Sequence, residues 1–221
     1  EMCIRDSFAN IRRNGIIAIG LEEGDTLNWV NVAKNNDEIL IGTSCGMAIR
    51  FGVSELRPLG RSARGVNSMK LRQGDMIIGS DIVPADYDAD LLVVTSDGFG
   101  KRSKLSEFRA QNRGGIGLIA TKFKTAQSRL VALTIVSEKD DIMVVTANGV
   151  VTRINAGDIS RQGRPATGVK IQNLQDNDSV ITVNKIVGQG DDIDKAIEEA
   201  VDKAVEQTKL IDVAEEEKTE E

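Results

Sequence analysis

The sequence repeats itself with a period of 51 or 52 residues, and this repeat constrains the fold more than any other feature. Three similar segments, EILIGTSCG, LLVVTSDG and IMVVTANG, each end in a glycine. These glycines are Gly46, Gly98 and Gly149. A second glycine follows each of them after 19 residues, and these are Gly65, Gly117 and Gly168. Self-similarity at such a fixed period is typical of stacked structural units that cover one another's apolar faces.

Charged residues keep the same register as the glycines. One arginine lies four residues after each first glycine, and another lies four residues before each second glycine. They are Arg50, Arg102 and Arg153, and Arg61, Arg113 and Arg164. An aspartate lies ten residues after the second glycine at Asp75 and Asp178, but the middle unit has KFKTAQSR instead. A shared register at this many positions indicates that the units have equivalent structures.

Each unit is predicted to form a blade of antiparallel strands. The β-branched runs LLVVT and IMVVT are typical of buried strands. Asp97-Gly98 and Asn148-Gly149 indicate tight hairpins, because these dipeptides favour the positive φ that a type I′ turn requires. VNSMKL, VKIQNL, IIGSDIV and VITVNKIV predict further strands. Four short strands in about 50 residues are typical of a propeller-like blade, so we expect an all-β fold.

The repeat divides the chain into three complete units and one half unit. The half unit is predicted over residues 8–37, because Gly15 lies 50 residues before Gly65. The complete units are predicted over residues 38–90, 91–141 and 142–187. The glycine that should precede Gly15 would fall before residue 1, so we expect the chain to be part of a longer protein. Residues 1–7 fit no unit and are interpreted as a non-native extension.

Charge is divided unevenly along the chain. The predicted tail spans residues 188–221, and within it residues 191–221 contain 13 acidic and 4 basic side chains, a net charge of −9. Residues 1–190 have a net charge of +3. Apolar spacing predicts a short helix over residues 191–209, followed by disordered residues. This division of charge favours nucleic-acid binding or self-regulation over catalysis on small molecules. A tail that only increases solubility explains the division equally well.

The composition excludes several classes of active site. The chain has no histidine, which removes histidine general bases and most zinc sites. Its two cysteines, Cys3 and Cys45, form no CxxC motif, which favours a reducing, cytoplasmic compartment. No apolar run approaches the ~18 residues of a membrane span. We therefore expect no catalytic residue, cofactor or metal in this chain, and no membrane partner.

The repeated arginines predict a surface for the phosphates of duplex DNA. Equivalent units would present their basic residues in a curved row that a duplex could follow. The aromatic content of 3% disfavours single strands, whose bases stack on aromatic side chains. The predicted DNA-binding residues are Arg50, Arg61, Arg64, Lys101, Arg102, Arg109, Arg113, Gly114, Gly115, Arg153 and Arg164.

Two other functions remain open on these residues. The first is a propeller that binds proteins and not DNA, in which the arginines only solvate the sheet edges. The second is an enzyme that uses Gly115-x-Gly117-x-x-Ala120 as a dinucleotide-binding loop, with Glu138 as its acidic partner. The enzyme requires a helix directly after Gly117. The repeat instead predicts a strand there.

The repeated motifs resemble those of a known family. FANIRRNGIIAIGLEEGD, RFGVSELRPLGRSARGVNSMKLRQGD, LLVVTSDGFGKRSKLSEFRAQNRGGIG and IMVVTANGVVTRINAGDISRQGRPATGV are similar to the C-terminal DNA-wrapping domain of the A subunit of bacterial DNA gyrase, with the A subunit of topoisomerase IV as a close relative. The resemblance covers about residues 8–187. It implies a β-pinwheel, a propeller-like fold whose blades exchange strands. Residues 111–117 resemble the family's QRRGGKG box, from which Asn112 and Ile116 depart.

The resemblance also implies a function. The chain would bind, bend and wrap duplex DNA without sequence specificity, as the C-terminal part of the A subunit of an ATP-dependent type II topoisomerase that supercoils DNA. Its partners would be DNA, the B subunit of gyrase and a second copy of the A subunit, while ATP and Mg²⁺ would bind elsewhere in the enzyme. A DNA-recruiting domain of the topoisomerase IV type stays open as an alternative.

Overall fold

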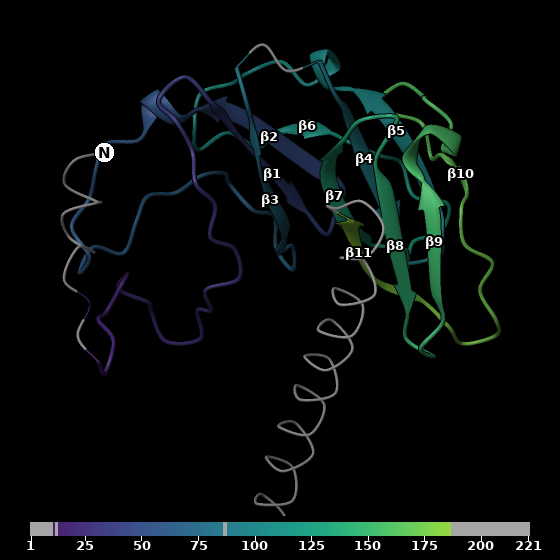
Figure 1. Cartoon of the computed structure of the whole chain (residues 1–221), viewed down its shortest axis with the longest axis horizontal. Coiled ribbons are helices and arrows are strands. Elements are labelled where there is room, and N and C mark those ends of the chain that lie inside the picture. The colour runs from purple at the N-terminus through teal and green to yellow at the C-terminus, as the bar shows by residue number, and fades with distance from the viewer. Residues whose placement is uncertain (1–10, 12, 86–87, 187–221) are drawn as a thin grey trace, which may run out of the picture. The chain divides into compact units, whose positions relative to one another are not determined.

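The computed structural model describes residue 11, residues 13–85 and residues 88–186 (Figure 1). The regular elements in this part of the chain are strands and short 3₁₀ helices, which confirms the predicted all-β fold. Three predicted features lie outside the described residues: the extension interpreted over residues 1–7, the acidic tail 188–221 and the helix predicted over 191–209.

The first sheet contains strands from two different units. β1 (Glu38–Thr43) and β2 (Met47–Gly52) form a hairpin around Gly46, and β3 (Ile77–Val83) pairs with the other edge of β1. The fourth strand, β6 (Leu118–Ile119), belongs to the second unit and pairs antiparallel with β2. The strand order is therefore β3-β1-β2-β6 (Figure 1).

The second sheet repeats this arrangement. β4 (Asp90–Thr95), β5 (Phe99–Lys104) and β7 (Leu130–Val136) belong to the second unit. β10 (Val169–Lys170) is supplied by the third unit, and the strand order is β10-β5-β4-β7. The second and third units thus each give one short strand to the sheet of the unit before them, which is the exchange that the resemblance implies.

The third sheet has the strand order β11-β8-β9. Its strands are β8 (Asp141–Thr146), β9 (Val151–Asn155) and β11 (Val180–Ile186). β9 lies at the edge of this sheet, and no strand of the described residues pairs with its outer side. A 3₁₀ helix follows the second strand of each complete unit, at Val53–Glu55, Leu105–Glu107 and Ala156–Asp158.

The second glycine of the repeat is explained by the strand exchange. Gly117 and Gly168 have φ values of +77° and +96°, and each directly precedes an exchanged strand. A Cβ atom on Gly117 would lie 2.5 Å from the carbonyl oxygen of Ala48, and one on Gly168 would lie 2.5 Å from that of Gly100. A side chain at either position would therefore push the exchanged strand away from the sheet that receives it.

Two predicted strands differ from the structure. VNSMKL, residues 66–71, forms no strand, and in VKIQNL only the two residues of β10 do. In the second and third units this part pairs with the sheet of the unit before it and not with its own hairpin. β6 and β10 meet the edges of β2 and β5, whereas no described strand edge is paired with residues 66–71. The segment has the composition of a strand but lacks the edge that would make it one.

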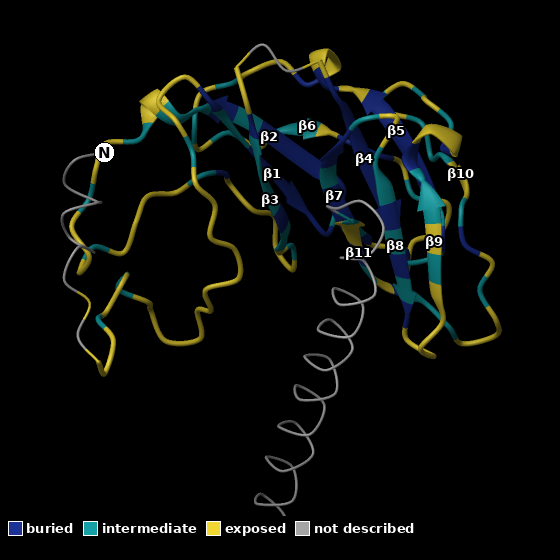
Figure 2. Ribbon diagram, viewed as in Figure 1, coloured by how far each residue is buried: buried dark blue, intermediate teal, exposed yellow. Residues whose placement is uncertain are grey.

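The apolar core lies between successive sheets. β4 is buried at all six positions, as Figure 2 shows for the middle of the sheet stack. Leu91 and Val93 belong to a cluster shared with the first sheet, whereas Leu92 and Val94 belong to a cluster shared with the third. The continuous apolar run of this strand therefore reflects burial on both of its faces.

The repeated aspartate fastens the hairpin of its unit. The Asp75 carboxylate accepts hydrogen bonds from the Ser44 hydroxyl and from the Cys45 amide, both at 2.9 Å. The middle unit lacks this aspartate, and there the donor and the acceptor change places. The Ser128 hydroxyl donates to the Asp97 carboxylate of the hairpin at 2.8 Å. In the middle unit, where the sequence is KFKTAQSR, a hydrogen bond between different residues therefore connects the same two turns.

Candidate nucleic-acid interface

Lys101, which we predicted to contact DNA, lies in the interior of the protein. It has no exposed surface, and it occupies the position that Ile49 holds in the first unit. Its Nζ donates hydrogen bonds to the carbonyl oxygens of Gly163, at 2.8 Å, and of Arg164. Burial lowers the pKa of this ammonium to about 8. The prediction is wrong for Lys101, because an enclosed group bonded to two carbonyls cannot reach a phosphate.

Arg102 is also enclosed, with only 5% of its side chain exposed. Its Nη1 donates to the carboxylates of Asp90, at 2.7 Å, and Glu138, at 3.2 Å. Its Nε and Nη2 donate to the backbone carbonyl oxygens of Ile159 and Gly157. Every guanidinium nitrogen is thus bonded within the protein. The predicted phosphate contact is wrong for this residue too.

The same pairing occurs at the two equivalent arginines. Arg50 pairs with Glu38 at 3.2 Å, and Arg153 pairs with Asp141. The acid lies twelve residues before the arginine in all three units, diagonally across the hairpin. Hydrogen bonds from Arg153 hold the pKa of the Asp141 carboxyl below its usual range. Arg153 keeps 54% of its side chain exposed, whereas Arg50 keeps 16%, so Arg153 has the most room for a phosphate.

The second set of arginines fastens the segments that follow the second glycines. Each guanidinium donates to the carbonyl oxygen that lies two residues after the second glycine of the preceding unit. The pairs are Arg61 with Ile17 at 3.4 Å, Arg113 with Asn67 at 2.6 Å, and Arg164 with Ile119 at 2.8 Å. To the described residues, each of these guanidinium groups donates from Nη1 and from no other nitrogen. Other N–H groups of these exposed or half-buried side chains remain available to a phosphate.

Gly114 and Gly115 lie in a loop that is fixed at both residues. The Gly114 amide donates to the carbonyl oxygen of Ser68, and the Gly115 carbonyl accepts from the Lys70 amide, both at 2.8 Å. Gly114 is exposed, has a φ of +81°, and has no atom within 4 Å of the place where a Cβ would be. A phosphate could therefore approach the backbone closely at Gly114, whereas Gly115 is half-buried.

The exposed cations lie mainly between the second strand and the last strand of each unit. Residues 56–74 contain five basic and no acidic side chains, and so do residues 108–129. Residues 159–174 contain three basic and no acidic ones. The exposed members of the first two stretches are Arg57, Arg61, Arg64, Lys70, Arg72, Arg109, Lys122, Lys124 and Arg129. We call these three stretches the basic segments. They place positive charge at the same point of each unit, partly on residues that the sequence prediction did not select.

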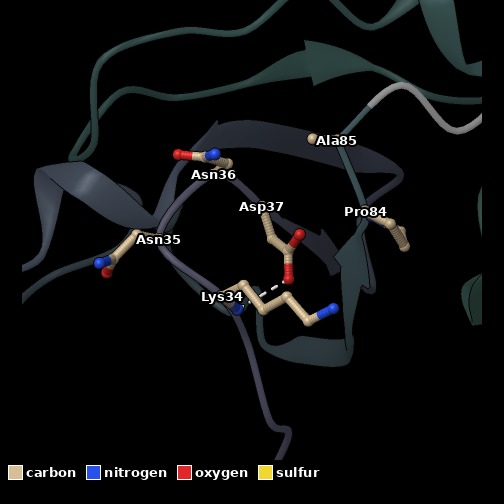
Figure 3. A pocket seen from close by; sticks show the side chains of 6 residues that line it. All are labelled: Lys34, Asn35, Asn36, Asp37, Pro84 and Ala85. Carbon is tan, nitrogen blue, oxygen red and sulfur yellow. Dashed lines mark hydrogen bonds between the residues drawn. The ribbon is translucent and has the colours of Figure 1, made fainter.

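A hollow of about 460 Å³ lies beside the turn that precedes β1 (Figure 3). Its lining consists of Lys34, Asn35, Asn36, Asp37, Pro84 and Ala85. The Asp37 carboxylate accepts a hydrogen bond from the Lys34 amide at 2.7 Å, so it closes the turn. The described residues contain no cluster of three or more metal-binding side chains. No helix in that part of the chain is long and apolar enough to cross a membrane.

The dinucleotide-binding interpretation of residues 115–120 is wrong. Gly117 is followed by β6, which pairs with β2, and not by a helix. The helix N-terminus that would hold a pyrophosphate is therefore missing at this place. Glu138 belongs instead to the ion-pair cluster with Arg102 and Arg161, at 3.2 Å from each.

Comparison with known proteins identifies the family of the chain. The sequence matches the family described as DNA gyrase C-terminal domain, beta-propeller, over residues 5–34, 37–84, 89–137 and 140–186. The chain belongs to this family. It is 40% identical to the DNA gyrase A subunit of Synechocystis sp. over 218 residues, and 42% identical to that of Staphylococcus epidermidis over 185 residues. Both matches cover 84% of the chain, but only 25% and 21% of the relatives' length.

Solved structures of gyrase-type C-terminal domains have the same fold. The chain matches the C-terminal domain of DNA topoisomerase IV with a TM-score of 0.78 and 25% identity, over 88% of this chain and 61% of that one. It matches the DNA gyrase A C-terminal domain with a TM-score of 0.71 and 29% identity, over 79% and 59%. These matches confirm the propeller-like fold, and they fall on the C-terminal domain and not on the catalytic region.

Proposed function

We propose that this gyrase-family domain binds duplex DNA through its phosphates, without sequence specificity, and wraps the DNA. The observation that carries the proposal is the set of basic segments, which present exposed cations and no acidic side chain. Because the units are equivalent, the basic segments recur at the same point of successive units. A duplex that follows them meets positive charge in each unit.

The placement of the aromatic residues favours duplex DNA over single strands. Phe51 and Phe108 are each 1% exposed, and Phe99 and Phe123 are half-buried. The most exposed aromatic side chain of the described residues is Trp29, at 41%. A single-stranded ligand needs several aromatic faces on which its bases can stack. Phosphate contacts by lysine and arginine need no such surface.

The parent protein that we propose is a type II topoisomerase of the gyrase type. In it this domain would act with the rest of the A subunit, a second copy of it and the B subunit, in the bacterial cytoplasm. ATP and Mg²⁺ would bind to parts of the enzyme outside this chain. The support is the 40% identity to a gyrase A subunit. Among the solved structures, the identity is 29% to the gyrase A C-terminal domain and 25% to that of topoisomerase IV.

A linking-number assay separates wrapping from binding. Nicked circular DNA is closed by ligase with the chain bound, and the topoisomers are then resolved. Chiral wrapping predicts a change in linking number that grows with the amount of protein. Binding, measured in parallel by fluorescence anisotropy, should weaken with salt by about 0.9 in log–log slope for each neutralised phosphate. A slope near zero contradicts DNA binding, whereas a steep slope with an unchanged linking number contradicts only the wrapping.

A further inference from the structure

Lys101 is buried, but the carbonyl groups that it holds belong to a loop with a candidate DNA contact. Its side chain is 0% exposed, and its Nζ donates to the carbonyl oxygens of Gly163, at 2.8 Å, and of Arg164. Burying an ammonium is costly unless hydrogen bonds replace its hydration. The role of this lysine therefore depends on what it holds, and Arg164 lies in the third basic segment.

The equivalent loop of the second unit is fastened without a lysine. The Gly114 amide donates to the carbonyl oxygen of Ser68, and the Gly115 carbonyl accepts the Lys70 amide, both at 2.8 Å. These two backbone hydrogen bonds connect the loop of the second unit to the first unit. An isoleucine, Ile49, stands at the position that corresponds to the buried lysine.

The sequence of the third unit removes the first of these backbone hydrogen bonds. Pro165 occupies the position of Gly114, and proline has no amide hydrogen to donate. The carbonyl of the next residue, Ala166, accepts the Thr121 hydroxyl at 3.2 Å. Side chains therefore fasten the loop of the third unit where backbone amides fasten that of the second, and the ammonium of Lys101 is one of them.

Arg164 is fixed through its main chain and through its guanidinium. Its amide donates to the Glu107 carboxylate at 3.0 Å, and its Nη1 donates to the carbonyl oxygen of Ile119 at 2.8 Å. The guanidinium carbon lies 5.9 Å from the centre of the Phe108 ring, within the range of a cation–π contact. Lys101 adds the hydrogen bond to the Arg164 carbonyl.

Arg113, the equivalent arginine of the second unit, shares two of these contacts. Its amide donates to the Glu55 carboxylate, and its Nη1 donates to the carbonyl oxygen of Asn67. Leu56 stands at the position of the aromatic ring, and Ile49 stands at that of the lysine. An arginine that is already fixed loses less conformational freedom when it binds a phosphate. The additional contacts in the third unit therefore favour phosphate binding.

We propose that Lys101 is a positioning residue for DNA binding, which acts through Arg164 and touches no phosphate itself. This inference rests on the proposed function, because it requires that Arg164 contacts DNA. The ammonium holds the Arg164 carbonyl and thereby fixes the main chain from which the guanidinium extends. Without the ammonium the loop is less ordered and the Arg164 contact is weaker, while the phosphate contacts of the other units remain.

A double-mutant cycle on the full chain tests the proposal. Lys101→Met and Arg164→Ala are measured singly and together by anisotropy titrations of duplex DNA over a salt series. Arg164→Ala should lower the salt slope by about 0.9, and Lys101→Met should reproduce most of that loss. Lys101→Met should weaken binding at least about threefold in the natural background, and should not weaken it further beside Arg164→Ala.

Arg113→Ala is the matched control, because Arg113 has the same position in a loop that no lysine holds. Its loss of affinity should add to that of Lys101→Met. Circular dichroism gives the folded fraction, so that affinities are compared per folded molecule. The proposal is overturned if Lys101→Met binds as the natural chain does. An equal loss with and without Arg164→Ala also overturns it, because the lysine would then act by its charge or through general stability.

Hydrogen exchange in the natural chain gives a test that needs no variant of the lysine. The Arg164 amide should be protected at least as well as the Arg113 amide, since its loop has the additional fastening. Rapid exchange of the Arg164 amide beside a protected Arg113 amide contradicts the proposal. A natural chain without salt-dependent DNA binding contradicts the proposed function itself. If the natural chain binds but Arg164→Ala leaves the salt slope unchanged, the positioning role alone fails.

Discussion

The two strand-exchange interfaces have the same backbone pairing but different chemistry. Where β6 meets β2, the receiving strand contributes Ile49 and Phe51 to an apolar cluster, and both are 1% exposed. Where β10 meets β5, the equivalent positions hold Lys101 and Ser103, which donate hydrogen bonds to the loop of the third unit. The repeat thus specifies where strands pair. The individual side chains set the stability of each interface and its dependence on pH.

A cluster of four charges adds to the polarity of the second interface. Arg161 of the third unit joins Arg102 on the carboxylates of Asp90 and Glu138. Its hydrogen bond to Asp90, at 2.9 Å, raises the pKa of Arg161 above its ordinary value. The residue equivalent to Arg161 in the second unit is Ala110, so the first interface cannot form this cluster. The second interface therefore depends on ionic groups that the first does without.

Replacing Arg102 should produce the largest change. Arg102→Met leaves the Asp90 carboxylate, which is 5% exposed, with Arg161 as its remaining ionic partner. We expect a loss of about 3–5 kcal/mol in the free energy of unfolding, which is typical of breaking a buried ion pair. Arg153→Met, the matched change at the exposed pair, should cost at most about 1 kcal/mol. Urea unfolding, monitored by circular dichroism, measures both losses. Equal losses would contradict the expectation that the buried ion pair contributes more stability than the exposed one.

Lys101 should give the second interface a pH dependence that the first lacks. Its pKa is about 8 in the folded protein and 10.5 without the fold, so the unfolded chain binds the proton more tightly. The unfolding free energy should therefore rise between about pH 8 and pH 10.5, as the buried ammonium loses its charge. The rise is up to about 3 kcal/mol, at about 1.4 kcal/mol per pKa unit.

The difference in stability between the natural chain and Lys101→Met isolates this contribution, because the other lysines titrate in both proteins. Lys170→Met serves as the control, since Lys170 lies on an exposed part of β10. A wild-type minus Lys101→Met difference that stays flat from neutral pH to pH 10.5 would show that the ammonium is not held as the structure describes.

Local signals in the sequence predicted the hairpins and the all-β fold, but they did not show which cations are interior. Charge alone predicts a DNA contact for Lys101 and Arg102, because it carries no information on which residues of a strand face the interior. Two signals in the repeat identify them as structural. Ile49 stands at the position of Lys101 in the first unit, and an acid recurs twelve residues before Arg102 and its equivalents. Residues 66–71 failed as a strand for another reason, since an exchanged strand forms only on an edge that another unit supplies.

The contrast between buried and exposed arginines should also appear in DNA binding. Arg57 and Arg109 occupy equivalent exposed positions in the basic segments. Replacing either by alanine should weaken duplex binding at all sequences alike and lower the salt slope by about 0.9, because one phosphate contact is lost. Arg102→Met should leave the affinity per folded molecule unchanged. Anisotropy titrations over a salt series measure all three, and a reduced slope for Arg102→Met alone would place the DNA surface elsewhere.

The smallest effect should come from the acidic tail, whose net charge of −9 over residues 191–221 faces a net charge of +3 in the rest of the chain. A tail tethered to the basic segments has a local concentration of the order of millimolar, enough for a weak electrostatic contact to compete with DNA. Removing residues 188–221 should therefore tighten DNA binding at low salt, and the gap should close as salt screens the charges.

A tail of equal length with its acids changed to the corresponding amides controls for the bulk of the chain, and it should behave as the truncated protein does. The free peptide 191–221, added in trans at millimolar concentration, should displace DNA from the truncated protein if the contact is a direct competition. If the peptide leaves the DNA bound, or if truncation does not change the affinity at low salt, the tail only solubilises the protein. In that case the tail does not occupy the basic segments, and the salt dependence of DNA binding is that of the phosphate contacts alone.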